Sequence, residues 1–154
     1  MRDTYYDSIM LIERLHRLFL DVIKQELDRM RIYDINNVQC LLIYNIGDSE
    51  LSIGELSTRG YYMGTNVSYN LRKLVEYEYV IQQPSLHDKR SSTIKLSPKG
   101  IELHQKMQKL LKEHQQLLEE SKVTAQSLKD TLADLKQLEQ VWSGILARQS
   151  IFRS

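Results

Sequence analysis

The chain has 154 residues, of which 42% are hydrophobic and 27% are charged, which is the balance of a soluble globular protein. This length excludes two separate enzymatic domains, and no apolar run approaches the roughly 18 residues that a transmembrane helix needs. Residues 1–7 are polar and acidic, unlike a secretory signal, and the single cysteine, Cys40, excludes an internal disulfide and a cysteine cluster for zinc. We therefore expect a cytoplasmic protein without membrane contact.

Positive charge is concentrated in the middle third of the chain, although the formal net charge is only +1. Residues 1–50 carry 6 basic and 9 acidic side chains, residues 51–99 carry 7 and 4, and residues 100–154 carry 8 and 7. A local basic surface is what phosphate contact requires, because the binding free energy comes from counterions released where protein meets nucleic acid. The charge distribution alone fits an ordinary solvated surface as well as a phosphate-binding one, so the sequence motifs are needed to distinguish these two interpretations.

The first third of the chain predicts two helices. Apolar residues recur at three- and four-residue steps from Ile9 to Met30, the spacing of one helix face. Asp34 or Asn36 can cap a second helix that runs to Ile46 and is closed by Gly47, which tolerates the left-handed conformation of a helix end.

A short helix and a helix with one polar side follow. Ser52 can cap residues 53–58, and another helix begins near Thr65. The apolar side chains of this fourth helix are predicted to point inward: Val67, Leu71, Leu74 and Val75. Its polar and charged side chains lie largely on the other faces: Asn66, Ser68, Tyr69, Asn70, Arg72 and Lys73.

The pattern then changes from helical to extended. Residues 79–84 and 92–96 are short, β-prone runs on either side of the polar stretch 85–91, which predicts a hairpin with a charged tip. Ser97-Pro98 is a strong start signal for a fifth helix, because the missing N–H of proline would be unpaired at that position anyway.

Two helices with apolar seams complete the chain. The fifth helix carries a stripe of Leu103, Met107, Leu110, His114 and Leu117. After a break at residues 121–124, the sixth carries Leu128, Leu132, Leu135, Leu138, Trp142 and Ile145. Both stripes are typical of helix-packing seams.

This order of elements is that of a winged helix-turn-helix, in which the polar-sided helix lies in the major groove and the hairpin meets the flanking backbone. The predicted fold class is mainly α with a small β-hairpin wing, joined to a helical dimerisation domain. At the level of motifs the chain resembles the MarR family: residues 88–91 (Asp-Lys-Arg-Ser) resemble its wing motif, and residues 96–100 (Leu-Ser-Pro-Lys-Gly) its entry into the fifth helix. Leu56, Val67, Leu71 and Leu74 resemble its helix-turn-helix core. The segment 64–70 is similar to the LdtR-like subgroup of cell-envelope regulators.

The resemblance implies a sequence-specific transcription regulator that acts as a homodimer on double-stranded DNA with an inverted-repeat operator. Residues 1–34 and 97–154 would form the dimerisation region, and residues 35–96 the DNA-binding lobe. The alternatives are a winged-helix module that binds other proteins, since fold does not determine function, and a redox-sensing regulator that uses Cys40.

The candidate DNA-binding residues come from the fourth helix and the hairpin tip. Donors and acceptors that can read base edges or phosphates are Thr65, Asn66, Ser68, Tyr69 and Arg72. At the tip, Arg90 suits a narrow, electronegative minor groove, and His87 and Lys89 are placed for phosphate. Asp88 has the wrong sign for phosphate contact and is predicted to orient Arg90 or a backbone amide. Each of these side chains would also be ordinary on a solvated surface.

An enzyme is not predicted. The sequence has no Gly-rich phosphate loop and no nucleophile–base constellation, and its histidines at positions 16, 87, 104 and 114 are dispersed. We expect no catalytic residues, no cofactor and no metal site, and we expect His114 to be a packing residue.

A small aromatic effector is implied by the resemblance, because members of the family commonly bind such anions between the dimerisation helices and the DNA-binding lobe. The corresponding residues here are His16, Leu20, Cys40, Tyr44 and Met107, and plain core packing is the alternative for each. Cys40 falls in the middle of the second helix with no cation nearby in the sequence, which favours a structural role over a reactive thiolate.

Overall fold

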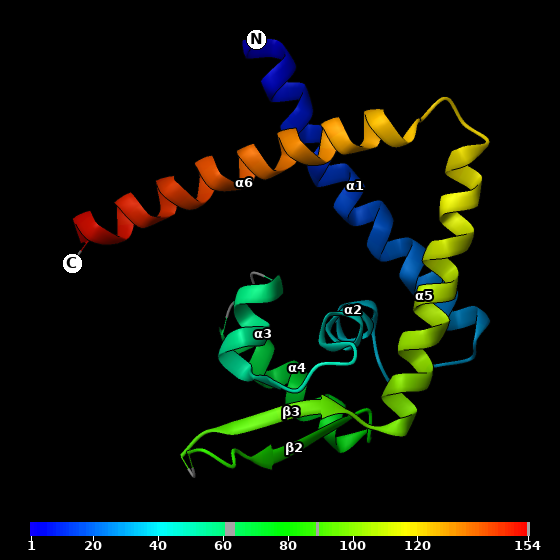
Figure 1. Cartoon of the computed structure of the whole chain (residues 1–154), viewed down its shortest axis with the longest axis vertical. Helices are drawn as coiled ribbons and strands as arrows, with labels where there is room; N and C mark the ends of the chain where they lie inside the picture. The colour runs from blue at the N-terminus through cyan, green and yellow to red at the C-terminus, as the bar shows by residue number, and fades with distance from the viewer. Residues whose placement is uncertain (61–63, 89, 154) are drawn as a thin grey trace. The chain divides into compact units, whose positions relative to one another are not determined.

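The computed structural model describes residues 1–60, 64–88 and 90–153, without the side chains of residues 64, 65 and 149–153. Within that part the chain forms a mainly helical protein with a small antiparallel sheet (Figure 1). The elements are α1 (Arg2–Arg29), α2 (Asn37–Ile46), β1 (Leu51–Ser52), α3 (Ile53–Gly60), α4 (Gly64–Glu76), β2 (Val80–Pro84), β3 (Ser92–Leu96), α5 (Pro98–Glu119) and α6 (Ala125–Arg153). The predicted fold class, mainly α with a small β-hairpin wing, is confirmed. The chain divides into two compact units, residues 1–108 and 109–154.

The first two helices form where the sequence predicts them, with one difference in extent. Helix α1 already begins at Arg2, and the acidic Asp3 in its first turn complements the helix dipole. The sequence analysis missed this early start because a polar first turn shows no apolar periodicity. Of the two candidate caps of α2, Asn36 is used: its side chain accepts from the Gln39 backbone N–H at 2.8 Å, and the Gln39 side chain accepts from the Asn36 N–H at 3.0 Å. This reciprocal capping box satisfies two N–H groups that have no partner inside the helix. Gly47 ends α2 with a φ of +55°.

The hairpin is part of a three-stranded sheet with the order β1-β3-β2. Strands β2 and β3 pair antiparallel from Val80 opposite Leu96 to Pro84 opposite Ser92. The sequence analysis did not predict β1, because two residues are too few to show an alternating pattern. Ser52 belongs to β1 and also caps α3, since its Oγ accepts from the Glu55 backbone N–H at 3.1 Å.

The core of residues 1–108 is built from one face of each helix and one side of the sheet. Three of the four side chains of α4 that were predicted to point inward are buried, and the fourth, Val75, is half-buried. The fully buried large side chains come from five helices and the sheet: Ile23, Leu42, Ile43, Ile46, Leu56, Leu74, Ile94 and Met107. Burial of such a side chain contributes about 1.5–3 kcal/mol to stability. The buried face of α4 therefore holds the helix in place and leaves its polar side at the surface.

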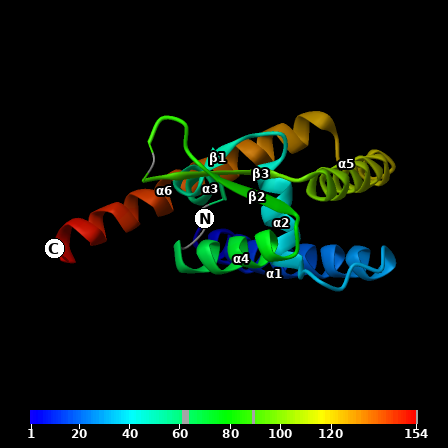
Figure 2. The same cartoon turned by 90° about the horizontal axis from the view of Figure 1, so that it is seen from below.

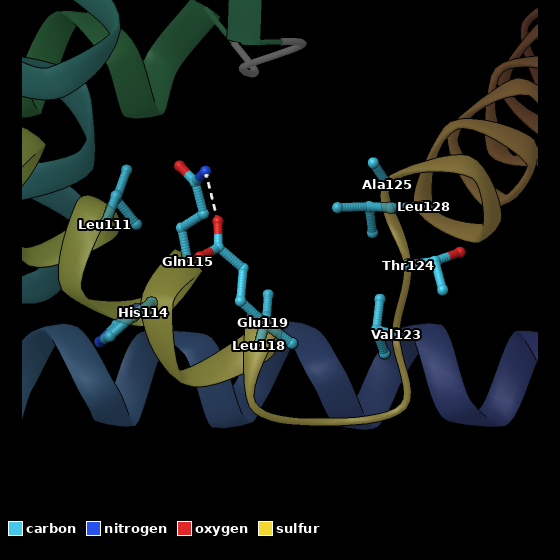
Figure 3. A pocket seen from close by; sticks show the side chains of 9 residues that line it. All are labelled: Leu111, His114, Gln115, Leu118, Glu119, Val123, Thr124, Ala125 and Leu128. Atoms are coloured by element: carbon cyan, nitrogen blue, oxygen red, sulfur yellow. Dashed lines mark hydrogen bonds between the residues drawn. The ribbon is translucent and has the colours of Figure 1, made fainter.

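Residues 109–154 bury much less. Helix α6 begins at a reciprocal cap in which Thr124 Oγ1 accepts from the Ser127 N–H at 3.0 Å and Ser127 Oγ accepts from the Thr124 N–H at 2.9 Å. A groove of about 520 Å³ lies at the corner between α5 and α6 (Figure 3). It is lined by Leu111, His114, Gln115, Leu118, Glu119, Val123, Thr124, Ala125 and Leu128. Most of the predicted α6 seam, including Leu132 and Ile145, is exposed in the single chain.

Tyr79 connects the end of α4, the hairpin and α5. Its backbone oxygen accepts from the Ser97 N–H at 3.0 Å, and the Ser97 hydroxyl, the predicted cap of α5, accepts from the Gly100 N–H at 3.1 Å. The Tyr79 hydroxyl donates to Asp34 at 2.9 Å, and Lys99 pairs with Asp34 at 3.2 Å while its ammonium lies 4.2 Å from the centre of the Tyr79 ring. Burial, the hydrogen bond to Asp34 and the charge of Asp34 raise the pKa of the Tyr79 hydroxyl, so it stays a donor.

Gly100 is needed at this junction because α5 comes very close to the hairpin. A β-carbon added at Gly100 would lie 2.2 Å from the carbonyl oxygen of Tyr79 and 3.2 Å from Leu96 Cβ. The clashing atom belongs to the backbone and cannot rotate away, so the first turn of α5 would have to move.

We predict that Gly100→Ala lowers the free energy of unfolding by roughly 1–3 kcal/mol, the usual cost of overpacking. Chemical denaturation would measure it. Gly54→Ala is the matched control: its nearest neighbour atom would be Ser52 Oγ at 3.8 Å, so we expect unchanged or slightly raised stability. Equal stability of the two variants would contradict the proposed clash.

Candidate nucleic-acid interface

Helix α4 presents one buried and one exposed face. Val67, Leu71 and Leu74 are buried, whereas Asn66, Ser68, Tyr69 and Arg72 are exposed. The Arg72 guanidinium carbon lies 5.7 Å from the centre of the Tyr69 ring, a distance at which the ring attracts the cation. Because the apolar face is held in the core, the polar face is a rigid surface of donors and acceptors. Figure 2 looks onto the side of residues 1–108 where α4 and the β2–β3 hairpin lie.

The hairpin tip is shaped by Asp88. Its carboxylate accepts from the Arg90 backbone N–H at 2.9 Å, and its carbonyl oxygen accepts from the Ser91 N–H at 3.2 Å. Ser85 closes the tip by donating its N–H to the Ser91 carbonyl at 3.0 Å. Orientation of a backbone amide is one of the two roles that the sequence analysis expected of Asp88. The Arg90 side chain is exposed, and its backbone N–H is held by Asp88.

The carboxylate of Glu50 lies beside the strands of the wing. Its carboxylate accepts from Thr93 Oγ1 at 2.9 Å and from Gln83 Nε2 at 3.1 Å. The hydrogen bond from Thr93, then that from Gln83, and the charge of Lys95 lower the pKa of this carboxyl group. Glu50 therefore remains ionised and braces β2 and β3 from one side of the sheet.

The candidate residues fall into two groups on residues 1–108. Asn66, Ser68, Tyr69 and Arg72 share the exposed side of α4, and the tip brings His87, Asp88 and Arg90 together in an exposed turn. The side chain of Thr65 and the whole of Lys89 lie outside the described residues. Which of these side chains contact DNA stays a prediction.

The sequence analysis did not single out Gln39, which is buried and contacts the candidate recognition helix α4. Its Nε2 donates to Asn70 Oδ1 at 3.1 Å and so ties α2 to α4. The capping-box spacing of Asn36 and Gln39 was the available signal, but only the packing of α2 against α4 shows where the amide points.

The candidate effector residues differ in accessibility. Cys40 and Met107 are fully buried, Leu20 and Tyr44 are half-buried, and His16 is exposed on α1. The Tyr44 ring lies 5.3 Å from the ring of His104, centre to centre. His104 is buried, and its Nδ1 has no hydrogen-bond partner within the described part of the chain. Sequence reasoning considered His104 only as a metal ligand and missed this placement beside Tyr44.

Neither a membrane span nor a metal site is found in what the structure describes. None of the described helices is both long and apolar enough to cross a bilayer. Across residues 1–60, 64–88 and 90–153, no three His, Cys, Asp or Glu side chains gather to hold a metal ion.

Cys40 is enclosed by the core. Its side chain has no exposed surface, and burial raises the pKa of the thiol from 9.0 to about 12. Since the thiolate is the reactive form, this environment makes the thiol inert, in keeping with the structural role that the sequence favours.

The comparisons with known proteins agree with this geometry. Residues 35–100 match the model of a winged helix DNA-binding domain. The chain is 35% identical over 148 residues to the exopolysaccharide II synthesis transcriptional activator ExpG of Rhizobium meliloti, covering 96% of this chain and 76% of that protein.

Two solved structures illustrate the likeness in fold. One is FabT of Streptococcus pneumoniae in complex with DNA, with a TM-score of 0.75, 18% identity and coverage of 92% of this chain and 99% of that one. The other is MarR of Staphylococcus aureus in complex with salicylate and kanamycin, with a TM-score of 0.70, 20% identity and coverage of 93% of both chains.

The fold and the exposed polar helix therefore define a winged-helix DNA-binding protein. The chain belongs to the MarR family of winged-helix transcription regulators. It is accordingly a DNA-binding regulator of transcription and not an enzyme. The narrower similarity to LdtR-like regulators stays a prediction.

The burial of Cys40 predicts slow thiol chemistry and a specific dependence on pH. Well below pH 9 the thiol is almost fully protonated in both states. Above it the unfolded thiol ionises while the folded one does not, so the stability that Cys40 contributes is lost as the pH rises from 9 toward about 12. We expect a thiol reagent at pH 8 to label the denatured protein rapidly and the folded protein slowly.

The pH dependence is measured as the difference in unfolding free energy between wild type and Cys40→Ala, which cancels the other groups that titrate in this range. Rapid labelling of the folded protein at neutral pH, or release of bound DNA by peroxide in wild type but not in Cys40→Ser, would contradict the structural role.

Proposed function

We propose that the chain binds an inverted-repeat operator as a homodimer, with α4 of each copy in the major groove and the hairpin tip over the adjacent minor groove. The observation that carries the proposal is the division of α4 into a face buried in the core and an exposed face of donors and acceptors. The presence of DNA in the FabT structure supports it. For two helix-turn-helix lobes, the half-site centres would lie one helical turn apart, about 10 base pairs.

The two groups of candidate residues have different tasks in this proposal. On α4, Thr65, Asn66, Ser68, Tyr69 and Arg72 face base edges and nearby phosphates. At the tip, Arg90 enters the minor groove, while His87 and Lys89 neutralise phosphates. Base contacts decide which sequence is bound, whereas phosphate and minor-groove contacts supply affinity that depends on salt.

We propose that residues 1–34 and 97–154 form the dimerisation region and residues 35–96 the DNA-binding lobe. Large apolar side chains are exposed along the outer parts of this region: Tyr6, Leu11, Leu15 and Leu18 on α1, and Leu128, Leu132, Val141 and Leu146 on α6. Exposed apolar surface of this extent marks an interaction site, and a second copy of the chain is the occupant that the two-fold symmetry of an inverted repeat requires.

We further propose that a small aromatic effector modulates DNA binding. The salicylate complex of the S. aureus neighbour supports this class of ligand. The half-buried Tyr44 and Leu20 and the exposed His16 are reachable, whereas Cys40 and Met107 would be contacted only if the packing opened. Titration with salicylate should raise the melting temperature in a saturable way and weaken operator binding, and the absence of both effects across a series of phenolic acids would rule the proposal out.

The DNA-binding proposal predicts different outcomes for the two groups of residues. Arg90→Ala should weaken binding to many sequences and reduce the slope of affinity against salt by about 1, because it removes a sequence-independent contact. Asn66→Ala or Ser68→Ala should change preference at particular base pairs, by about 1–3 kcal/mol for a good contact. Fluorescence anisotropy with labelled duplexes at several salt concentrations measures both.

Lys122→Ala is the control for loss of one positive charge, because Lys122 is exposed in the α5–α6 connection, outside the winged lobe. It should bind DNA as wild type does. An Arg90→Ala variant with unchanged affinity and salt slope would show that the tip does not contact DNA.

The dimer proposal predicts that Leu132→Glu shifts the protein toward monomers, because it places a charge in the apolar seam of α6. Sedimentation at micromolar concentration measures the shift. Gln137→Glu adds the same charge to another side of the same helix, where the side chain is exposed, and should leave the dimer intact. A folded wild-type monomer at these concentrations would refute the proposal.

A further inference from the structure

The side chain of Gln39 is a buried polar link between α2 and the exposed face of α4. It is only 6% exposed and uses both ends of its carboxamide. Its Oε1 accepts from the Asn36 backbone N–H at 3.0 Å, and its Nε2 donates to Asn70 Oδ1 at 3.1 Å. A buried carboxamide with both ends paired is restricted to one orientation.

The first of these two hydrogen bonds, from the Asn36 backbone N–H to Gln39, determines the direction of the second, from Gln39 to Asn70. A backbone N–H can only donate, so it requires the oxygen of Gln39 on its side and leaves the NH₂ group of Gln39 toward α4. That NH₂ group can only donate, so Asn70 must turn its oxygen toward α2. The NH₂ group of Asn70 is then left on the side of Asn70 that faces away from Gln39.

Asn70 lies at the edge of the proposed reading surface. It is half-buried and follows Asn66 by four residues, so the two side chains lie one above the other on the same side of α4. The start of α2, next to Asn36, is also held in place, because Asn37 Nδ2 donates to the Leu20 carbonyl oxygen of α1 at 3.1 Å. The first turn of α2 is thereby held between α1 and α4.

We propose that Gln39 is a positioning residue for sequence recognition, and that Asn70, held by it, is a specificity-determining donor at the edge of α4. The inference rests on the proposed DNA-binding function. With its oxygen turned toward Gln39, Asn70 points its N–H groups away from α2 and therefore selects an acceptor in the major groove, such as guanine O6 or N7, adenine N7 or thymine O4. It disfavours a base edge that presents a donor at the same place.

The test begins by selecting duplexes from a randomised pool with wild-type protein, then measuring affinities for the selected duplex and for each single-base substitution. Gln39→Met removes the hydrogen bonds at nearly constant volume. We expect about a tenfold loss of discrimination at the base pair read by Asn70, with unchanged affinity for unrelated DNA. Asn70→Ala should lose discrimination at the same base pair, and the double variant should lose no more than either single variant.

Gln39→Glu gives a readout that a purely structural role would not produce. A carboxylate still accepts from the Asn36 N–H, but its other oxygen cannot donate to Asn70, so the Asn70 amide must turn and donate to it. Asn70 then presents its oxygen to DNA, and we expect preference at this base pair to shift toward a donor, adenine N6 or cytosine N4. This variant also covers the case in which Gln39→Met fails to fold.

Asn36→Ala is the matched control for stability. It removes the cap bond to the Gln39 backbone N–H but keeps the Asn36 backbone N–H that orients the Gln39 side chain. It should lower the melting temperature and leave base preference unchanged. Loss of the same discrimination in Asn36→Ala, or additive losses in the double variant, would overturn the role of Gln39.

If the wild-type protein selects no sequence from the pool, the proposed function itself fails. If it selects one and both Gln39 variants keep its preference, only this inference fails.

Discussion

The close approach of Gly100 to the carbonyl oxygen of Tyr79 is the constraint on which the arrangement of residues 1–108 depends. It allows α5 to begin directly against the end of the α4 turn, where the Ser97 N–H bonds to the same oxygen. The Tyr79 hydroxyl and Lys99 then meet at Asp34, so the connection between α1 and α2 joins the same junction. Because a packed backbone contact does not deform gradually, we expect the start of α5 and the hairpin to move together.

Polar contacts of α2 act on the other side of α4. The apolar face of α4 supplies most of the stabilisation, but hydrophobic contact is not directional and does not specify the orientation of a polar group. The hydrogen bond from Gln39 to Asn70 does so, at a net gain of only about 1 kcal/mol. DNA recognition needs this division of tasks, because a base contact depends on donor direction more than on overall stability.

Sequence reasoning predicted the elements because each has a local cause. The capping residues Asn36, Ser52 and Ser97 and the β-prone runs of the hairpin act over a few residues, and the structure confirms them. The extent of α1 and the existence of β1 were missed, since a polar first turn and a two-residue strand leave no periodic signal. The sequence also identified the polar side of α4, because the positions of its apolar residues determine which side is buried.

The sequence by itself thus determined the helices, the hairpin and the family, and it favoured a structural role for Cys40. Only the tertiary structure decided the pairing of Gln39 with Asn70, the position of His104 beside Tyr44, and the need for glycine at position 100. These contacts join residues that are 31, 60 and 21 positions apart in the chain. Local propensities act within a turn or a strand pair, whereas such contacts exist only after the apolar faces have packed and brought distant backbone segments together.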